Sequence, residues 1–449
     1  SGDAKFPMPS VEKLAAEGAR FTDAYACAGV CHPSRSAILT GVYQQRFGTD
    51  NNLGGPSYNG TSASQRTVAQ RLQAVGYRTY GIGKWHMGNT AEYHPNQRGF
   101  DHWYGINAGS RSYYTATGED NEFQNDMVLR PQDEGLYVAD RIGNACLAFI
   151  DEHLANNSGS PFYIYCAFTS VHGPMDMKPN DLRYARLQNE FGLTFGNYTP
   201  DIVFSGSELK TQTNRYMLAA MSLALDENVG KILDKVNASG LSSNTIVIYL
   251  NDNGGAGWNA SAGGNYSYNL PLRGYKGSSM VDGSIRVPAA IAWSGVVPAG
   301  QTVASPVNSI DFMATIVNAS GSTPPAVRNG LEGLDLLPLL RDGTPLPANR
   351  VLCWRAGDAN SGGSAARMGN WKILADNASG IFKLYNLATD IGETTDVSAA
   401  NPAIFNELKE RFHAWNAHNI EPLYGGDDLI VDSALERSGI TSGYRINNH

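Results

Sequence analysis

The sequence predicts an α/β protein in which a large mixed, mostly parallel sheet is sandwiched between helices and a smaller α+β module follows. Two observations carry this prediction. Apolar strands alternate with long amphipathic helices over most of the chain, and short strands replace this pattern beyond a proline-rich stretch. A chain of 449 residues is long enough for both parts. We therefore expect a main α/β domain over 1–340 and an α+β subdomain with a wrapping tail over 341–449.

The spacing of apolar residues and the residues that end helices predict the elements of the main domain. Val11, Leu14 and Ala15 recur at helical spacing and predict a helix over 10–18 that stops at Gly18. The near-continuous apolar run 161–168 predicts a strand that is buried on both faces. Further helices are expected over 33–40, 64–75, 137–154 and 217–236, and further strands over 77–82, 245–250 and 287–293.

The C-terminal module is expected after a linker over 337–347 that is rich in proline. Short apolar runs at 351–354, 371–374 and 383–387 predict strands, and the stretch 402–418 predicts a helix. The tail 421–449 has no period and is expected to wrap the surface.

Composition excludes several function classes. A formal charge of −8 argues against a surface for nucleic acid or anionic membrane, because those partners need a basic field. No apolar run approaches the roughly 18 residues that a membrane span requires. The five cysteines form no metal-ligand spacing and are too few for a disulfide scaffold.

The stretch from Cys31 to Gly41 places a reactive side chain beside an anion-binding helix end. Pro33 suits the first position of a helix, so Cys31 is expected just before the helix, near its positive end. Arg35 returns to the same face one turn later. These features indicate a site for a tetrahedral oxyanion. The alternative is that Cys31 is a small apolar residue ahead of an ordinary helix.

Four further polar clusters follow expected strands or lie between them, at the edge of an α/β sheet where ligands bind. Each one alone has an ordinary structural explanation, since a histidine after a strand is commonly a hydrogen-bonded structural residue and Asp-Asn-Gly-Gly is a good turn sequence. Their joint occurrence favours one shared site. The candidates are Lys84, His86, His172, Asp252, Asn253 and Lys276.

The motif Cys-x-Pro-Ser-Arg with Leu-Thr-Gly at 39–41 resembles the signature of the formylglycine-dependent type I sulfatases, which belong to the alkaline phosphatase superfamily. The similarity extends from about residue 8 to about residue 417. It includes Gly-Lys-Trp-His-Met-Gly at 83–88, Asp-Asn-Gly-Gly at 252–255, Gly-Ser-Ile-Arg-Val-Pro at 283–288 and Trp-Lys at 371–372. The resemblance implies an alkaline phosphatase-like fold and hydrolysis of a sulfate ester.

The resemblance also implies roles for individual residues. Cys31 is expected to be oxidised after translation to formylglycine, whose hydrate is the nucleophile, with bound Ca²⁺ assisting. The histidine at 86 is expected to contact formylglycine, and the histidine at 172 to lie near the leaving-group oxygen. The implied catalytic residues are Cys31, Arg35, His86 and His172, the implied substrate-binding residues are Lys84, Lys276, Arg35 and His172, and the implied calcium ligands are Cys31, Asp252 and Asn253.

The partners that the resemblance implies are a sulfated oligo- or polysaccharide and a formylglycine-generating or sulfatase-maturing enzyme, with the protein exported to the periplasm or the cell exterior. A sugar is preferred over a small aryl ester because aromatic residues are frequent in polar stretches. Such rings stack on sugars, but they occur as often in a plain core. The residues concerned are Trp103, Tyr104, Tyr113, Tyr114 and Trp258.

One departure from the family pattern concerns metal binding. Sulfatases of this type carry two adjacent aspartates on a first strand before the lead-in helix, and the sequence given does not contain that strand. We expect it to be missing from the given sequence rather than from the protein, because its loss would leave open sheet edges. Two alternatives stay open: a phosphate or phosphonate ester hydrolase of the same superfamily, and an inactive homologue that binds sulfated glycans.

Overall fold

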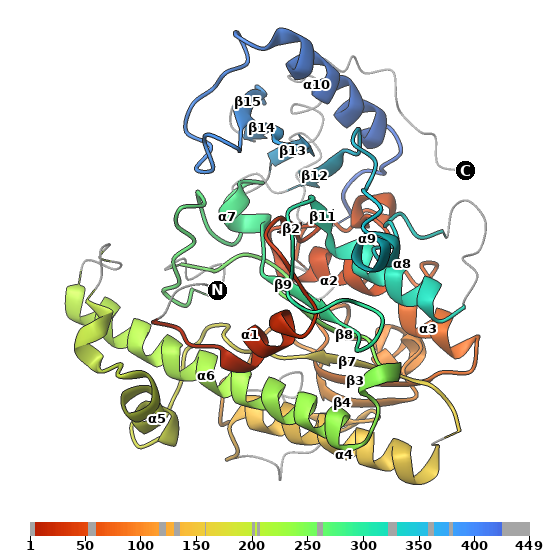
Figure 1. Ribbon diagram of the computed structural model, residues 1–449, viewed down its shortest axis with the longest axis vertical. Coiled ribbons are helices and arrows are strands. Elements are labelled where there is room, and N and C mark those ends of the chain that lie inside the picture. Colours follow the sequence, from red (N-terminus) through yellow and green to blue (C-terminus); the bar gives the residue numbers. More distant parts are fainter. Residues whose placement is uncertain are drawn as a thin grey trace.

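The computed structural model describes a large α/β part and a smaller module that packs on one end of it (Figure 1). The described residues are 5–52, 60–115, 123–129, 135–157, 159–199, 203, 207–257, 264–321, 330–357, 363–376 and 380–423.

The strands of the α/β part form two main sheets. The first has the order β6-β5-β4-β3-β7, with β3 parallel to both β4 and β7, and the second has the order β10-β1-β9-β8. A two-stranded pair, β11-β2, lies beside them. The bounds are β1 Ala19–Phe21, β2 Ala24–Tyr25, β3 Arg78–Lys84, β4 His102–Ile106, β5 Gln124–Asn125, β6 Val128–Leu129, β7 Phe162–Ala167, β8 Val247–Leu250, β9 Ala289–Ala292, β10 Gln301–Val303 and β11 Val307–Asn308.

The mixed α/β architecture is confirmed, but the burial expected for the strand at 161–168 is wrong. All residues of β7 except Ala167 are only partly buried, because β7 is the last strand of its described sheet. β8 is likewise the last strand of the second sheet and is partly buried throughout. Tyr165 of β7 and Ile248 of β8 pack against the same hydrophobic cluster, so the ends of the two sheets share one core.

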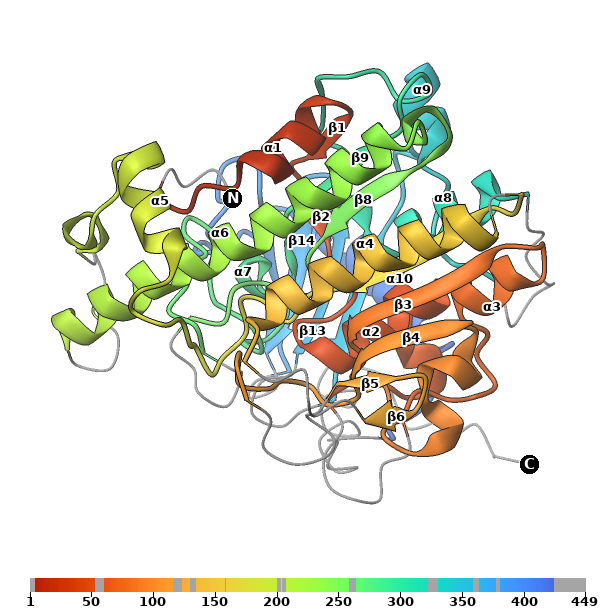
Figure 2. The same ribbon diagram turned by 90° about the horizontal axis from the view of Figure 1, so that it is seen from below.

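Helices cover both faces of these sheets, as Figure 2 shows. On one face, α4 (Val138–Asn156) packs on β3 and β7 and against α6 (Glu208–Ala238), which also contacts α1 (Pro9–Ala16) and α5 (Leu182–Phe191). On the other face lie α2 (Cys31–Thr40), α3 (Val68–Gln73) and α8 (Ser309–Ala319). None of the helices in the described ranges is long and apolar enough to cross a bilayer.

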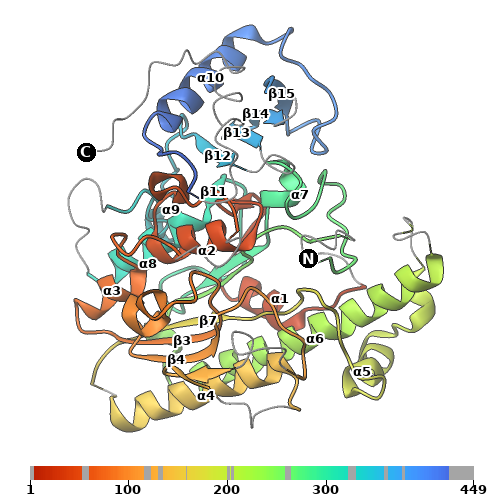
Figure 3. The ribbon, with the colours of Figure 1, turned by 180° about the vertical axis from the view of Figure 1, so that it is seen from behind.

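The C-terminal module is an antiparallel sheet, β12-β13-β14-β15, with α10 packed on β13 and β14 (Figure 3). The strands span Leu352–Ala356, Gly363–Met368, Trp371–Asp376 and Lys383–Asn386, and α10 spans Pro402–Asn416. β13 has no counterpart among the expected strands.

The expected linker over 337–347 contains a packed helix, α9 (Leu337–Asp342). Leu337 and Leu340 are buried in the core cluster of the main domain. Pro338 does not prevent this helix, because a proline in the first turn removes only an N–H that has no partner within the helix. Leu337–Asp342 therefore belongs to the core of the main domain.

Candidate active site

Cys31 is the first residue of α2, two residues earlier than the predicted helix start. Val30 has an extended backbone and precedes the helix, and Gly41 ends it with a φ of 69°, a left-handed conformation that glycine adopts without strain. Pro33 lies within the first turn, where its missing N–H costs nothing, so the helix extends past it toward the N-terminus. Cys31 therefore lies at the positive end of the helix, as expected.

Arg35 supports the site through hydrogen bonds to three neighbouring segments. Its Nε donates to Asp252 Oδ2 at 2.8 Å, and its Nη1 donates to the main-chain oxygen of Lys84 at 2.8 Å. Nη1 also lies 3.2 Å from the hydroxyl of Tyr165. One guanidinium thus joins α2 to the carboxyl ends of β3 and β8 and to β7, which fixes the positions of the residues that follow those strands.

Cys31 lies close to several of the candidate site residues that the sequence predicted. Its Sγ is 3.5 Å from Asn253 Oδ1. Burial raises the pKa of the thiol, but the positive charges of Lys84 and Lys276 and contacts with the imidazoles of His172 and His86 outweigh burial and hold the pKa well below its usual value. Residues from distant parts of the chain therefore meet at one point.

Lys84 ends β3 and is only 2% exposed. Burial lowers the pKa of its ammonium to about 8. Two residues on, His86 has a φ of 58°, and its ring packs so closely on Gly109 that a Cβ there would lie 2.6 Å from the ring. Burial lowers the pKa of His86 to about 4, so this imidazole is neutral near pH 7. Gly109 thus leaves the space that the ring of His86 occupies.

His172 and Lys276 form a direct contact. Lys276 Nζ lies 2.8 Å from His172 Nε2, and His172 Nδ1 lies 2.5 Å from the oxygen of Gly173. The backbone of the lysine loop is fixed as well, because Lys276 N donates to Gly255 O at 2.9 Å and the next amide, of Gly277, donates to Gly29 O at 2.9 Å. The lysine loop is therefore tied both to the turn after β8 and to the loop before Cys31.

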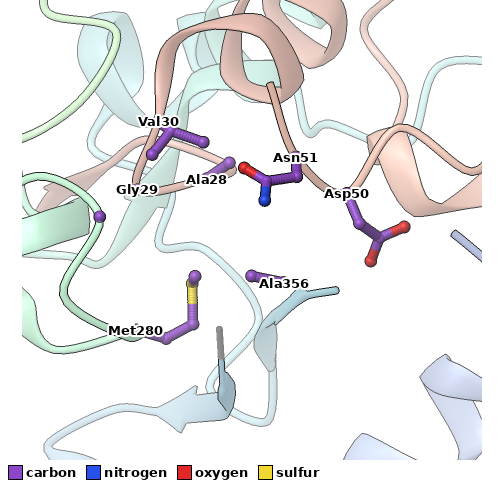
Figure 4. A pocket seen from close by; sticks show the side chains of 8 residues that line it. Ala28, Gly29, Val30, Asp50, Asn51, Met280 and Ala356 are labelled. Atoms are coloured by element: carbon purple, nitrogen blue, oxygen red, sulfur yellow. The ribbon is translucent and has the colours of Figure 1, made fainter. Parts of the chain in front are cut away.

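A small hollow that is open to solvent lies beside the loop that leads into Cys31 (Figure 4). Its acidic wall residue, Asp50, is neutralised by Arg355, whose Nε and Nη2 lie 2.8 and 3.0 Å from the two carboxylate oxygens. The hollow therefore offers little free charge. Its lining residues are Ala28, Gly29, Val30, Asp50, Asn51, Gly277, Met280 and Ala356.

The aromatic residues expected to stack on a sugar do not form such a surface. Trp103 and Tyr113 are buried in hydrophobic clusters, and Tyr104 and Tyr114 pack against one of them. Trp258 lies outside the described residues. These rings are core, because a large apolar ring is stabilised more by burial than by exposure.

Two residues at the site were missed from the sequence. Tyr165 reaches Arg35 only because β7 pairs in parallel with β3, and Asn265 donates from its Nδ2 to the oxygen of Val171 at 2.8 Å. Neither residue lies in a motif. The alternation of side chains along the expected strand 161–168 could have placed Tyr165 on one face, but no local signal marks Asn265.

The side chains that could bind a metal ion carry the oxygen atoms that Ca²⁺ prefers, but there are fewer of them than Ca²⁺ requires. Asp252 and Asn253 offer hard oxygen atoms beside Cys31, but Ca²⁺ takes six to eight oxygen ligands. Across the described ranges no cluster of three or more His, Cys, Asp or Glu side chains could hold a metal ion. The described residues alone therefore do not complete a calcium site.

The family model for sulfatases, named Sulfatase, matches residues 1–322. Mouse arylsulfatase J is 26% identical over 474 residues, covering 94% of this chain and 73% of the relative, and rat N-acetylgalactosamine-6-sulfatase is 30% identical over 363 residues, covering 76% and 62%. For several of these relatives the chain spans less than two thirds of their length.

Solved structures give the same result for the fold. The crystal structure of Ps i-CgsB in complex with k-i-k-neocarrahexaose superposes with a TM-score of 0.81 at 26% identity, covering 98% of this chain and 94% of the other. The phosphonate monoester hydrolase SpPMH from Silicibacter pomeroyi shares the fold, with a TM-score of 0.59 at 17% identity over 93% of this chain and 92% of the other. Because the family model matches more than half of the chain, this protein belongs to the sulfatase family.

Proposed function

We propose that this protein hydrolyses a sulfate ester on a sulfated saccharide, with formylglycine made from Cys31 as the nucleophile. The observation that carries the proposal is the set of buried cationic side chains around Cys31. Lys84 and Lys276 are 2% and 3% exposed, and both act on the charge of Cys31. A buried cation is costly without an anion, so the pair favours an anionic group beside position 31.

The chemistry at position 31 comes from the modified residue. Formylglycine, when hydrated, supplies one hydroxyl that attacks sulfur and a second hydroxyl whose deprotonation releases inorganic sulfate and restores the aldehyde. The protein must place the sulfate group against that hydroxyl. Because Cys31 begins α2, the free N–H groups of the first turn and the helix dipole favour the negative charge that develops there.

The neighbouring side chains act on the sulfate and on the leaving group. Lys84 and Lys276 stabilise the charge on the sulfuryl oxygens, and Arg35 adds positive charge while it holds Asp252 in place. His86 contacts position 31. His172 gives a proton to the oxygen that leaves with the sugar, a step typically worth about 10²- to 10⁴-fold in rate.

We also propose that Asp252 and Asn253 are ligands of a bound calcium ion. Their oxygen atoms have the chemistry that Ca²⁺ prefers, and the ion would supply further positive charge at the sulfate. Among the described residues no group of three or more His, Cys, Asp or Glu side chains completes the site. Metal analysis of the purified protein tests this assignment, and a protein that hydrolyses sulfate esters equally well after removal of divalent metals would contradict it.

The proposed substrate class rests on the relatives. Ps i-CgsB was crystallised with an oligosaccharide, and N-acetylgalactosamine-6-sulfatase is named for a sulfated sugar. The proposal includes a maturing enzyme that converts Cys31, and export of the protein from the cytoplasm.

The test is sulfate release by protein that has been co-expressed with a formylglycine-generating enzyme. Mass spectrometry of the peptide that contains Cys31 measures conversion, and ion chromatography measures sulfate released from a panel of sulfated oligosaccharides. Matched phosphate and phosphonate esters test the alternative hydrolase, and the Cys31→Ala variant is the control. Full conversion with no release from any ester, but with binding of the sulfated glycans, would instead support the inactive homologue.

A further inference from the structure

The loop that carries His172 is held by two side chains from outside it. The hydroxyl of Tyr113 donates to the main-chain oxygen of His172 at 2.9 Å and lies 3.3 Å from the oxygen of Thr169. From the other side, Asn265 Nδ2 donates to the oxygen of Val171 at 2.8 Å. Two consecutive carbonyl groups are thus bound by side chains that come from separate parts of the chain.

Both supporting residues are buried and fixed in turn. Tyr113 is 1% exposed, and its ring stacks on Tyr137 with centroids 5.1 Å apart. Asn265 is 6% exposed, and its Oδ1 accepts from the hydroxyl of Ser267 at 2.7 Å. Burial raises the pKa of Tyr113 well above its usual value, so its hydroxyl stays a neutral donor. The supports therefore have little freedom to move.

The position of the loop determines which ring nitrogen of His172 carries the proton. Lys276 Nζ can only donate while it is an ammonium, so His172 Nε2, 2.8 Å away, accepts from it. His172 Nδ1 then carries the proton that is donated to Gly173 O. A shift of the loop would change the contact with Lys276, which lies in a separate loop, whereas Gly173 would move together with His172.

We propose that Tyr113 and Asn265 are positioning residues that hold the His172 loop, so that His172 Nε2 stays aligned on the Lys276 ammonium, whose proton passes through Nε2 to the leaving-group oxygen. This inference rests on the proposed function, because it acts through the role assigned to His172. It names two residues outside every motif in the sequence.

The experiment compares two sulfate esters in wild-type protein and in the variants Tyr113→Phe and Asn265→Ala. An activated aryl sulfate leaves without help from an acid, whereas a sugar sulfate needs the proton. We expect kcat/KM for the sugar sulfate to fall about 10-fold or more and that for the aryl sulfate to change less than about 2-fold. Tyr198→Phe is the matched control, because its buried hydroxyl donates to Lys5 O at 2.6 Å, away from His172.

A second measurement does not depend on activity. Nitrogen NMR of histidine-labelled protein, with the His172 signal assigned from His172→Ala, reports which ring nitrogen carries the proton. We expect a single Nδ1-protonated form in the wild type and a mixture in both variants. An equal loss on both esters with an unchanged histidine signal would overturn the inference. If the wild type releases no sulfate at all, the proposed function fails, and the NMR result alone decides whether the two residues position His172.

Discussion

Two buried groups of charged side chains differ in how their cations are paired. In the group around Cys31, Lys276 contacts a histidine, and for the described residues no carboxylate lies within 4.0 Å of the Lys84 ammonium. In the group between the main domain and the C-terminal module, Lys372 lies 2.6 Å from Asp282 and 2.8 Å from Glu393. All three side chains of that second group are fully buried.

The difference separates a site that needs a ligand from a joint that is complete. In the joint, Tyr25 also donates to Asp282 Oδ2 at 2.7 Å, and the amide of Asp282 donates to Glu393 Oε2 at 2.8 Å. Burial raises the pKa of Asp282, but the neighbouring Lys372 outweighs burial and lowers the pKa overall. Around Cys31, by contrast, Asp252 pairs with Arg35 rather than with either lysine, so an added anion would relieve the repulsion between Lys84 and Lys276.

The joint also supports the site. Asp282 begins α7 (Asp282–Ile285), and the backbone oxygens of this segment accept hydrogen bonds from both neighbouring loops. Gly254 N donates to Ser284 O at 2.8 Å, and Ala26 N donates to Ile285 O at 2.8 Å. The segments that carry Asn253 and Cys31 are thus held by an element that the C-terminal module fixes through Lys372.

The largest effect is expected on stability when the joint is broken. Lys372→Met removes the cation that two buried carboxylates share and leaves Asp282 with Arg286 at 3.4 Å, so the free energy of unfolding should fall by about 3–5 kcal/mol. Denaturant titration measures it. Arg411→Met is the matched control, because its ion pair with Glu407 is more than a third exposed and should contribute only about 0.3–0.5 kcal/mol. Equal losses in the two variants would contradict the comparison.

The next largest effect is expected on activity. Unlike the Lys372→Met change, it should not lower the stability of the protein. Lys84→Met removes a cation that stabilises the transition state, so kcat/KM for sulfate release should fall about 10²- to 10³-fold. The free energy of unfolding should be unchanged or rise by about 1 kcal/mol, since the removed charge is buried and has no carboxylate within 4.0 Å among the described residues. Rate measurements and denaturant titration on one preparation check both. A variant that loses stability as Lys372→Met does would show that Lys84 has a structural partner.

The residues of the site differ in how far the sequence alone could predict them. Cys31, Lys84, His172 and Asp252 could be named as candidates because each follows an expected strand or lies at a helix start, and because each lies in a motif that resembles the sulfatase pattern. The bracing role of Arg35 depends on the register of distant strands, which no local pattern encodes. The same holds for Asn265.

The errors have local physical causes. A proline marks the first turn of a helix but not its first residue, so the start of α2 was placed at Pro33 instead of Cys31. For the same reason, a proline in the first turn, the segment that forms α9 was predicted to be part of a linker. Aromatic residues in polar stretches gave no information on burial, so stacking on a sugar and a place in the core stayed open for Trp103 and Tyr113, which lie in the core.

A smaller effect is expected from coupling within the joint. Once Lys372→Met has removed the cation, Glu393→Gln should cost less than it does in the wild type, because it then removes an unpaired buried charge. The coupling energy from the double-mutant cycle should be about 1–2 kcal/mol. Unfolding of the wild type, both single variants and the double variant measures it. Additive losses would mean that Lys372 and Glu393 act independently, despite their separation of 2.8 Å.

The smallest effect is the stabilisation of the site by an anion. Sulfate at ten times its dissociation constant should raise the free energy of unfolding of the unconverted protein by about 1.4 kcal/mol, because it binds the folded state alone. Sulfate also stabilises proteins in general by exclusion from their surface, so the shift must be compared with that of a Lys84→Met/Lys276→Met variant at the same salt concentration. The variant should keep only the general part of the shift. If both proteins respond alike, the two lysines do not form an anion site, and the contrast between the two buried groups is lost.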